Sequence, residues 1–439
     1  MTSTTAATPG AASGPVPAPS PSPAPSPAPS NAARVLRLVH EEGPITRAEV
    51  TRRTGLNRST TLALVGELVD RGLLHEDLPA AGAPGTGVGR PSPVVRAAPD
   101  VVAAAVTVEV DAVSVALVGL DGTVRSRSVE PQHRPPTPDE AVETVAALLD
   151  RLRPTGPGAP GASAPAGLRL VGVGVAVPGT VRVEDGTVQD APHLGWTDAP
   201  LAGPLAERTG LPVRAANDAN LGAWAERLAG SGRGVDDLVY LNGGASGIGG
   251  GVITAGRPLS GADGYAGELG HTFVAANGIR CHCGAVGCLE TEASRDDLAT
   301  AAGTAPDDLV ALAAALAEGR PDVERVVDRQ VAALATALRN AIHTVNPTMV
   351  VLGGFLGVLL DHVGDRILDD VRAQSMTGTA DRLRIVPAAL GPDVLVHGAA
   401  EIAFGDLLRD PDRIALAVPA TPTTRTSDRV DAVGETRTA

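Results

Sequence analysis

The chain contains 439 residues, of which 43% are hydrophobic, and it carries a formal net charge of −14. This length predicts two or three domains with a sizeable core, and the acidic balance argues against a surface that binds nucleic acid non-specifically. No run of about 18 apolar residues occurs and no secretory signal is recognisable, so we expect a cytoplasmic protein without a membrane span.

The two ends of the chain have biased compositions. Residues 1–30 consist mainly of Ala, Pro, Ser and Thr, and residues 409–439 are rich in Thr, Pro, Ala and Arg. Proline interrupts helical and sheet hydrogen bonding, and the first segment has no apolar face to bury. We therefore expect two disordered tails around a folded region at residues 31–408.

Residues 31–98 have the element order of a winged helix-turn-helix domain. Asn31, Thr46 and Asn57 are suitable N-caps for three helices, and Ala48 and Val50 are candidates for the inward face of the second helix. The predicted elements are a helix from residue 31, helices at 47–54 and 57 to about 71, strands at 73–76 and 93–96, and a wing tip at 87–91. This order resembles the DNA-binding domain of winged-helix repressors and predicts operator DNA as a partner.

The third of these helices is the candidate recognition helix. Thr61, Leu64, Val65 and Leu68 fall on one helical face and are predicted to pack inward. The DNA-binding candidates on the opposite face and in the wing are Arg58, Ser59, Thr60, Leu62 and Arg90. Arginine and hydroxyl groups suit phosphates and base edges, whereas Leu62 either contacts thymine methyl groups or indicates a phase shifted by one residue. The alternative is a small helical domain for capping or dimerisation.

Residues 99–408 alternate between strand and helix patterns, as expected for an α/β body. Strands are predicted at 101–110, 113–120 and 168–177, a helix at 139–152 and a surface loop at 154–167. Farther on, Asn217 and Asp218 follow a strand and open a helix. Residues 238–242 form a strand that enters a glycine-rich hairpin.

All three cysteines of the chain lie close together, ten residues after a histidine. Cys281, Cys283 and Cys288, with His271, offer the four N and S ligands that structural zinc prefers. Gly284 and Gly287 allow the tight loop that brings the sulfurs together. His282 could compete as a ligand, and the alternative is a group of buried thiols or one disulfide with a free thiol. Clustered cysteines at metal spacing suit a reducing cytosol.

The motif Glu-x-Gly-His followed by Cys-x-Cys-Gly-x-x-Gly-Cys-x-Glu at residues 268–290 resembles the signature of the ROK family of repressors and sugar kinases. The resemblance implies an α/β, actin-like (ribonuclease H-like) two-lobed fold with a structural zinc ion. It also implies a sugar site formed by Gly179, Asn217, Asp218, Glu268, His271 and Glu290. In the kinases of the family, the aspartate at the position of Asp218 is the catalytic base. Trp196 either forms a wall of this pocket or is a core residue.

One departure from the family pattern concerns the first phosphate-binding hairpin. The kinases have an acid followed by Gly-Gly-Thr, whereas this chain has residues 109–113 (Glu-Val-Asp-Ala-Val), whose side chains would block a phosphate. We therefore predict a sugar-responsive regulator of carbohydrate metabolism, most simply a repressor without enzyme activity, that acts as a homodimer or homotetramer. The alternatives are an ATP-dependent sugar kinase with an N-terminal appendage and a regulator that responds to a partner protein.

Overall fold

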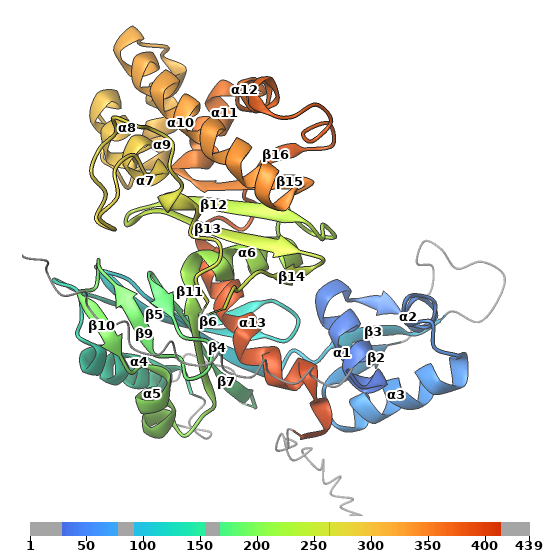
Figure 1. The fold of residues 1–439 in the computed structure, drawn as a ribbon. Helices are drawn as coiled ribbons and strands as arrows, with labels where there is room; N and C mark the ends of the chain where they lie inside the picture. Colours follow the sequence, from blue (N-terminus) through green and yellow to red (C-terminus); the bar gives the residue numbers. More distant parts are fainter. Residues whose placement is uncertain (1–28, 78–91, 154–166, 263, 414–439) are drawn as a thin grey trace, which may run out of the picture.

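The computed structural model describes residues 29–77, 92–153, 167–262 and 264–413. Residues 1–28 and 414–439 of the predicted tails, residues 154–166 of the predicted surface loop and the wing tip with Arg90 lie outside these residues. The tails were predicted a few residues too long, because Ser30 caps the first helix, Arg409 ends the last α-helix, and residues 411–413 form a 3₁₀ turn with Pro411 buried. The described chain folds into an N-terminal unit and a larger two-lobed body (Figure 1). None of its described helices is long and apolar enough to cross a bilayer.

The N-terminal unit (residues 29–97) has the predicted helix and strand order. It contains α1 (Asn31–Glu42), α2 (Arg47–Thr54), α3 (Arg58–Asp70) and a sheet in which β3 (Val94–Ala97) lies between β1 (Ile45–Thr46) and β2 (Leu74–Asp77). Thr46 and Asn57 cap α2 and α3 as predicted, because their side chains accept hydrogen bonds from Glu49 and Thr60 amides. The cap of α1 is Ser30 and not Asn31, which is the first helical residue.

The predicted phase of α3 is confirmed. Thr61, Val65 and Leu68 are buried, Leu64 is half-buried, and the Leu62 side chain is 53% exposed. The prediction for α2 was half right, because Val50 is buried but Ala48 is exposed. Ala48 lies in the first turn of α2, where its amide donates to the Ser92 hydroxyl at 3.2 Å and its side chain is left exposed.

The first lobe of the body is built on a five-stranded sheet in the order β11-β7-β4-β5-β6. Its strands are β4 (Val101–Val108), β5 (Ala112–Gly119), β6 (Val124–Pro131), β7 (Arg169–Val177) and β11 (Val213–Asn217). Every residue of β4 is buried, since the strand is covered on both faces and consists of Val, Ala and one Thr. Helices α4 (Pro138–Leu152) and α5 (Ala202–Thr209) pack on this lobe, and β8 (Thr180–Val181), β9 (Val188–Ala191) and β10 (Trp196–Ala199) form a small sheet beside it.

The second lobe repeats this arrangement with the sheet order β14-β13-β12-β15-β16. Its strands are β12 (Leu238–Gly244), β13 (Gly247–Thr254), β14 (Arg257–Pro258), β15 (Met349–Gly354) and β16 (Arg384–Pro387). Its helices are α7 (Leu289–Glu292), α8 (Arg295–Ala302), α9 (Leu309–Ala317), α10 (Pro321–Val345), α11 (Phe355–Val363) and α12 (Arg366–Gln374). In each lobe, an antiparallel meander of three strands is followed by two parallel strands added on the side of the first strand.

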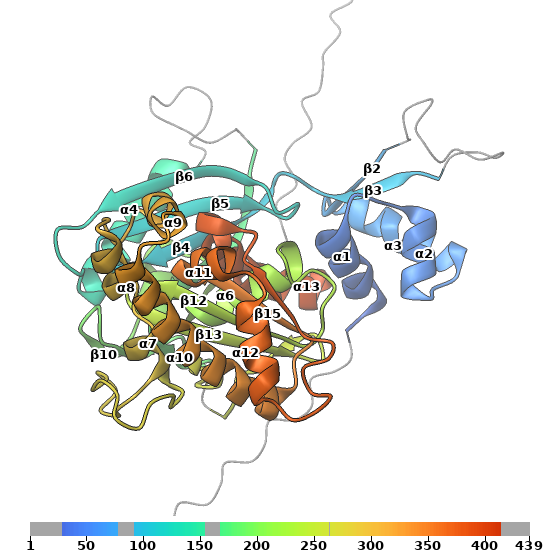
Figure 2. The same ribbon diagram turned by 90° about the horizontal axis from the view of Figure 1, so that it is seen from above.

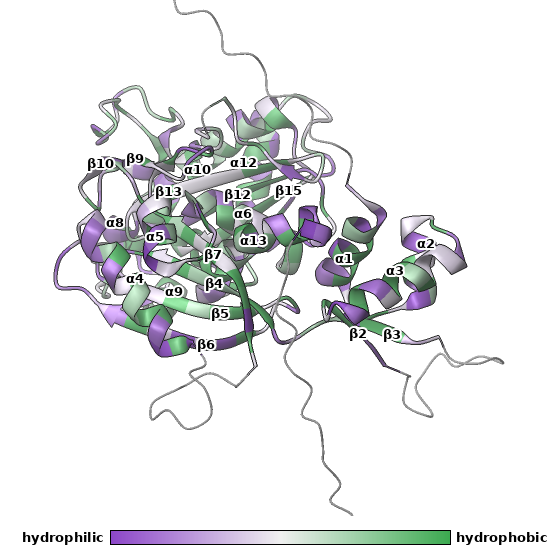
Figure 3. Cartoon of the chain, turned by 90° about the horizontal axis from the view of Figure 1, so that it is seen from below, coloured by the Kyte–Doolittle hydropathy of each residue, from purple (hydrophilic) through white to green (hydrophobic). Residues whose placement is uncertain are grey.

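Two helices join the lobes to one another and to the N-terminal unit. Helix α6 (Asp218–Ala229) follows β11 and packs against β12 and β13, so it links the two sheets. Helix α13 (Val394–Arg409) packs on α6, β4 and β7 and reaches α1 (Figures 1 and 2). Apolar residues are concentrated on the central strands β4, β5 and β7, whereas the helices outside them alternate apolar and polar residues (Figure 3). The core of the body therefore lies around the sheets and the two linking helices.

Candidate functional site

The predicted sugar-site residues converge on one cavity between the two lobes, with a volume of about 380 Å³. Both lobes and the loop before α7 contribute to its wall. The six predicted residues Gly179, Asn217, Asp218, Glu268, His271 and Glu290 all line it. Residues that are up to 111 positions apart are therefore neighbours in the fold, because β7, β11 and the 268–290 segment all end at the same opening.

Asn217 and Asp218 lie at the junction of β11 and α6, where the chain changes from strand to helix. The Asn217 side chain accepts a hydrogen bond from the Asn220 amide at 2.9 Å, which makes it the N-cap of α6. Its amide group donates to the Gly179 carbonyl at 3.0 Å, so it connects α6 to the turn after β7. Asn217 therefore both caps α6 and lines the cavity.

The carboxyl groups at the cavity lie in an environment that disfavours their charge. Burial raises the pKa of Asp218 to about 7; the Ala219 amide opposes this rise, while the charges of Glu109 and Glu268 add to it. Burial also raises the pKa of Glu268, with His271 opposing and Glu290 adding to the shift. Groups that offer hydrogen bonds without a net charge, such as hydroxyls, suit such a site.

A second set of side chains forms a cluster of possible metal ligands beside the cavity. One ligand atom each from His271, Cys281, Cys283 and Cys288 lies within 4.8 Å of the others. Gly284 and Gly287 have φ angles of 93° and 77°, which explains why glycine occupies both positions of the loop. The three cysteines are free thiols, so the alternative of a disulfide does not hold in this structure.

The distances in this cluster fit a tetrahedral ion. The sulfurs of Cys283 and Cys288 are 3.7 Å apart, and the sulfur of Cys281 is 3.6 Å from Nδ1 of His271. Bonds of about 2.3 Å to sulfur and 2.1 Å to nitrogen would place such ligands about 3.8 Å and 3.6 Å apart around zinc. The Cys281 thiol donates to the Glu290 carboxylate at 2.9 Å, and a metal ion would replace that proton. The donor set therefore fits zinc.

An overlapping set could bind a metal in a different way. Nδ1 of His271 and Nδ1 of His282 lie 3.4 Å and 3.1 Å from Oε1 of Glu290, so these three residues also meet the distance criterion for a shared ion. Two histidines and a carboxylate would form an open site with fewer soft ligands. The cluster with three cysteines is the better fit for a structural ion, because it offers four ligands.

Five further polar residues line the cavity without having been predicted as sugar-site or metal residues: Thr180, Asp190, His193, Asn242 and Ser246. Asn242 offered a signal, because it is a polar residue at the end of a buried strand, like Asn217. His193 and Ser246 lie in turns, and Thr180 and Asp190 lie in the short strands β8 and β9, where the direction of a side chain depends on the folded chain. Trp196 is not among the lining residues; it is 3% exposed and its indole N–H donates to the Pro136 carbonyl at 2.8 Å. Of the two interpretations of Trp196, the core residue is correct.

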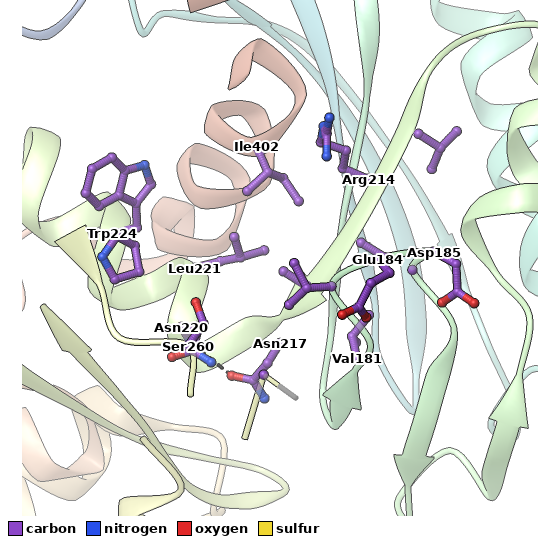
Figure 4. A pocket seen from close by; sticks show the side chains of 17 residues that line it. Val181, Glu184, Asp185, Arg214, Asn217, Asn220, Leu221, Trp224, Ser260 and Ile402 are labelled. Carbon is purple, nitrogen blue, oxygen red and sulfur yellow. Dashed lines mark hydrogen bonds between the residues drawn. The ribbon is translucent and has the colours of Figure 1, made fainter. Parts of the chain in front are cut away.

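A second cavity of about 350 Å³ shares Asn217 with the first (Figure 4). Trp224, Leu221 and Ile402 form its apolar side, and Glu184 and Arg214 lie at another side. Arg214 is already paired with Asp406 at 2.7 Å.

Residues 109–111, which we expected to correspond to the first phosphate-binding hairpin, form a tight turn. The Glu109 amide donates to the Ala112 carbonyl at 2.9 Å, so only Glu109, Val110 and Asp111 separate β4 from β5. The side chains of Glu109 and Asp111 are exposed.

In the N-terminal unit, the DNA-binding candidates of α3 lie on one open face. Arg58, Ser59 and Leu62 are exposed, and Thr60 is half-buried. The Ser59 hydroxyl donates to Asn57 at 2.7 Å. Arg58 is the first residue of α3, where the positive end of the helix dipole favours anions.

Comparison with known proteins identifies the body. A model of the ROK family matches residues 103–405, which is well over half of the chain. The chain belongs to the ROK family. A model of the MarR family matches residues 27–82, which include the three helices of the N-terminal unit.

The relatives of this ROK protein are regulators and kinases. It is 27% identical to the xylose repressor of Bacillus subtilis over 386 residues, which cover 86% of this chain and 96% of the repressor. It is 36% identical to the glucokinase of Thermotoga maritima over 252 residues, which cover 52% of this chain and 78% of the kinase. Among solved structures, a ROK family transcriptional regulator that is a homologue of the Escherichia coli Mlc protein has a TM-score of 0.70 and 28% identity, covering 87% of this chain and 96% of that one. The predicted fold, a two-lobed ROK body preceded by a winged-helix unit, is confirmed.

Proposed function

We propose that this ROK protein is a sugar-responsive transcriptional regulator, most simply a repressor. The observation that carries the proposal is that one chain contains an exposed MarR-type helix and a polar cavity between two ROK lobes. Its similarity to a xylose repressor and to a ROK regulator extends over 86% and 87% of the chain, so it includes the N-terminal unit.

The chemistry of the cavity supports a sugar or sugar derivative as the ligand. A sugar presents several hydroxyl groups, each of which donates and accepts hydrogen bonds. Asp218, Glu268 and Glu290 would each accept from hydroxyls, and Asn217 would both donate and accept. The Gly179 backbone would lie against the ring, and His271 would donate from the nitrogen that is not bound to a metal. D-xylose and D-glucose are the first candidates because relatives are a xylose repressor and a glucokinase.

The zinc ion that fits His271, Cys281, Cys283 and Cys288 would be structural. All four ligand positions would come from the protein, so no position would remain open for chemistry. The ion would hold the 268–290 segment against the cavity and fix the position of Glu268, His271 and Glu290.

Operator DNA would bind through residues 31–98, and the sugar through residues 99–408. Arg58, Ser59, Thr60 and Leu62 would enter or flank the major groove, with Arg90 of the wing at the phosphate backbone or minor groove. Two copies on a two-fold symmetric operator would form the working homodimer, and pairs of dimers would form a tetramer.

We propose no phosphoryl transfer by this chain. The turn at residues 109–111 bears side chains where ATP phosphates would need close contact with backbone amides. The second candidate function, a sugar kinase, is favoured by one observation: Asp218 has the position and the raised pKa of a general base.

The experiment is a thermal-shift screen of the purified protein against D-xylose, D-glucose and their phosphorylated and N-acetylated forms, each with and without ATP and Mg²⁺. A sugar at 100 times its dissociation constant stabilises the native state by about 2.7 kcal/mol. A shift with a sugar alone, together with release or tightening of DNA in an electrophoretic assay, supports the regulator. Sugar-dependent hydrolysis of ATP would establish the kinase instead. No shift with any sugar would contradict the sugar site.

A further inference from the structure

The N-terminal unit is attached to the body through a buried guanidinium group. Arg169, the first residue of β7, has a side chain that is 7% exposed and donates from Nε to Asp100 at 2.8 Å. Its terminal nitrogens donate to the carbonyls of Arg71, at 3.4 Å, and Gly72. These carbonyls lie at the C-terminal end of α3, where backbone acceptors lack helical partners and the helix dipole is negative. A residue of the body thus caps the candidate recognition helix.

A second buried contact joins the same two parts of the molecule. Nε2 of His40 on α1 lies 3.0 Å from Glu401 on α13, and Nδ1 lies 2.6 Å from the Leu120 carbonyl of the body. The side chains of His40 and Glu401 are 4% and 15% exposed. Apolar residues of α1 and α3 also belong to one continuous core with β4 and α13. The N-terminal unit is therefore fixed to the body in a defined orientation.

Each contact lies on a path of packed elements that begins at the ligand cavity. Strand β7 runs from Arg169 to Val177, and the next two residues, Pro178 and Gly179, line the cavity. A strand of this length spans about 30 Å. Helix α6 begins at Asp218 in the cavity wall and packs along α13, which carries Glu401. The cavity and the recognition helix are therefore at opposite ends of the same elements.

The contacts among β7, α6 and α13 leave little space for independent movement. A Cβ atom at Gly174 of β7 would lie 1.8 Å from the Ala399 carbonyl of α13. A Cβ atom at Gly398 of α13 would lie 2.5 Å from the Leu221 carbonyl of α6. Backbones touch at both places without an intervening side chain that could change its rotamer. A displacement of α6 or β7 at the cavity would thus move α13 as well, because closely packed interiors transmit strain.

We infer that Arg169 and Glu401 are positioning residues that pass the state of the ligand cavity to the recognition helix, through β7 and through α6 and α13. This inference rests on the proposed function as a sugar-responsive regulator. The junction contact set (Arg169, Asp100, His40 and Glu401) selects one orientation of α1 and α3 relative to the lobes. Ligand closure of the lobes changes that orientation or its stability, which biases DNA binding.

The test uses the full chain and four variants. Arg169→Met and Glu401→Gln each remove a charge from the junction; glutamine keeps the size of glutamate, and methionine keeps an unbranched side chain without the guanidinium group. Arg214→Met and Asp406→Asn are matched controls, because this pair also joins a strand of the first lobe to α13, at 2.7 Å, but is not part of the junction. The DNA probe is a duplex selected from a random pool by the wild-type protein, and the ligand probes are D-xylose and D-glucose.

Sugar affinity is measured by calorimetry, and DNA affinity by fluorescence anisotropy with and without saturating sugar. Arg169→Met and Glu401→Gln should bind sugar within about twofold and free DNA within about threefold of wild type. The sugar-induced change in DNA affinity should fall to less than a third of the wild-type ratio, while both controls keep it. Wild-type ratios in both junction variants would overturn the inference. An equal loss of DNA affinity with and without sugar would also overturn the inference. That result is expected if the junction only attaches the N-terminal unit to the body and does not respond to the sugar.

A readout without sugar separates this inference from the proposed function. If the wild type shows no sugar effect on DNA binding, the proposed function fails. Hydrogen exchange of α1 and α3 amides then tests the junction directly. If the junction orients these helices, their amides should exchange at least about threefold faster in Arg169→Met and Glu401→Gln than in the controls. Equal exchange would refute it.

Discussion

At the scale of single residues, the cavity is defined by carboxyl groups placed where their charge is disfavoured. Asp218 is surrounded by protein and faces Glu109 and Glu268, and these surroundings raise its pKa from an ordinary 3.8 to about 7. The empty cavity therefore carries an electrostatic cost that uncharged hydroxyl groups of a ligand would reduce. Residues that bind a ligand commonly make the ligand-free protein less stable than it could be.

The first prediction concerns Asp218→Asn. Because the pKa of Asp218 is raised in the folded protein, its ionisation destabilises the native state. That cost is absent below pH 3.8, grows as pH rises and is complete above pH 7. One pKa unit corresponds to about 1.4 kcal/mol, and contact with cavity water reduces the total, so the variant should be about 1–3 kcal/mol more stable at pH 8. The gain should vanish near pH 4, as measured by urea unfolding.

The same variant should lose most of its sugar affinity, because the substitution replaces one of the two acceptor oxygens of Asp218 by an NH2 group, which only donates. Asp111→Asn serves as the control, since Asp111 is exposed on the turn beside the site. Equal stability of wild type and Asp218→Asn at pH 8 would show that the ionised Asp218 carboxylate does not destabilise the folded protein.

The second prediction distinguishes the two possible metal sites. Cys283→Ser should lower the zinc content after dialysis from about one ion per chain to near zero, and should lower Tm by several degrees, because metal binding contributes to folding. His282→Asn should retain zinc, since His282 belongs only to the alternative set with His271 and Glu290. The measurement is elemental analysis of both variants with differential scanning fluorimetry. Loss of zinc in His282→Asn but not in Cys283→Ser would assign the metal to the alternative set.

At the scale of elements, α3 is a helix of 13 residues with one face packed in the core and the other face exposed. Asn57 caps its N-terminus, Thr61, Val65 and Leu68 bury one face, and Arg169 from the body caps its C-terminus. The opposite face has no packing role, which leaves Arg58 and Leu62 free to contact DNA.

The third prediction is that Arg58→Ala weakens DNA binding about tenfold without affecting sugar binding. The loss of one charge at the helix N-terminus should also reduce the slope of log affinity against log salt by about 1 if Arg58 contacts a phosphate. Arg52→Ala is the matched control, because Arg52 lies on α2, is 70% exposed and is already paired with Glu49. Anisotropy titrations at several salt concentrations measure both quantities. Unchanged affinity in Arg58→Ala would remove Arg58 from the DNA interface.

At the scale of the whole molecule, the described residues form four hydrophobic cores, one of which lies between α6, β12 and β15. The second lobe has its own core around α10, the first lobe has one against α4, and a third includes the N-terminal unit, β4 and α13. Burial by itself lowers the pKa of His40 at this third core. The charge and hydrogen bond of Glu401 and the Leu120 carbonyl outweigh it, and the pKa rises to about 9. The attachment of the N-terminal unit therefore depends on a protonated histidine.

The fourth prediction follows from the raised pKa of His40. A histidine whose pKa is raised from 6.5 to about 9 contributes stability that is fully present below pH 6.5 and is lost as pH rises through 9. The charged groups that face His40 are the carboxylates of Glu401 and Glu41. Between pH 6.5 and 9.5, the unfolding free energy of wild type should fall by about 1–3 kcal/mol more than that of His40→Gln. Parallel pH profiles of the two proteins would contradict the buried ion pair.

Much of the local structure followed from the sequence, because its causes lie within one or two turns of the chain. Thr46 and Asn57 cap their helices through residues three positions away, and the inward face of α3 follows from the helical period. Gly284 and Gly287 permit the turn that brings Cys283 and Cys288 together. The predictions of Asn31 as the cap of α1 and of an inward position for Ala48 were wrong, because adjacent polar residues and weak apolar faces leave such details open.

The family motifs in the sequence were enough to identify the two-lobed fold and the six residues that meet at the cavity. The positions of these residues in the sequence do not give the distances between them in space. Those distances depend on how β7, β11 and the 268–290 segment meet at one opening. The raised pKa of Asp218, the core position of Trp196 and the contacts of Arg169 and His40 with distant partners arose only in the folded chain. Neighbouring residues determine caps, turns and periodicity, whereas burial and long-range pairing depend on which elements pack together, and that is decided by the tertiary structure.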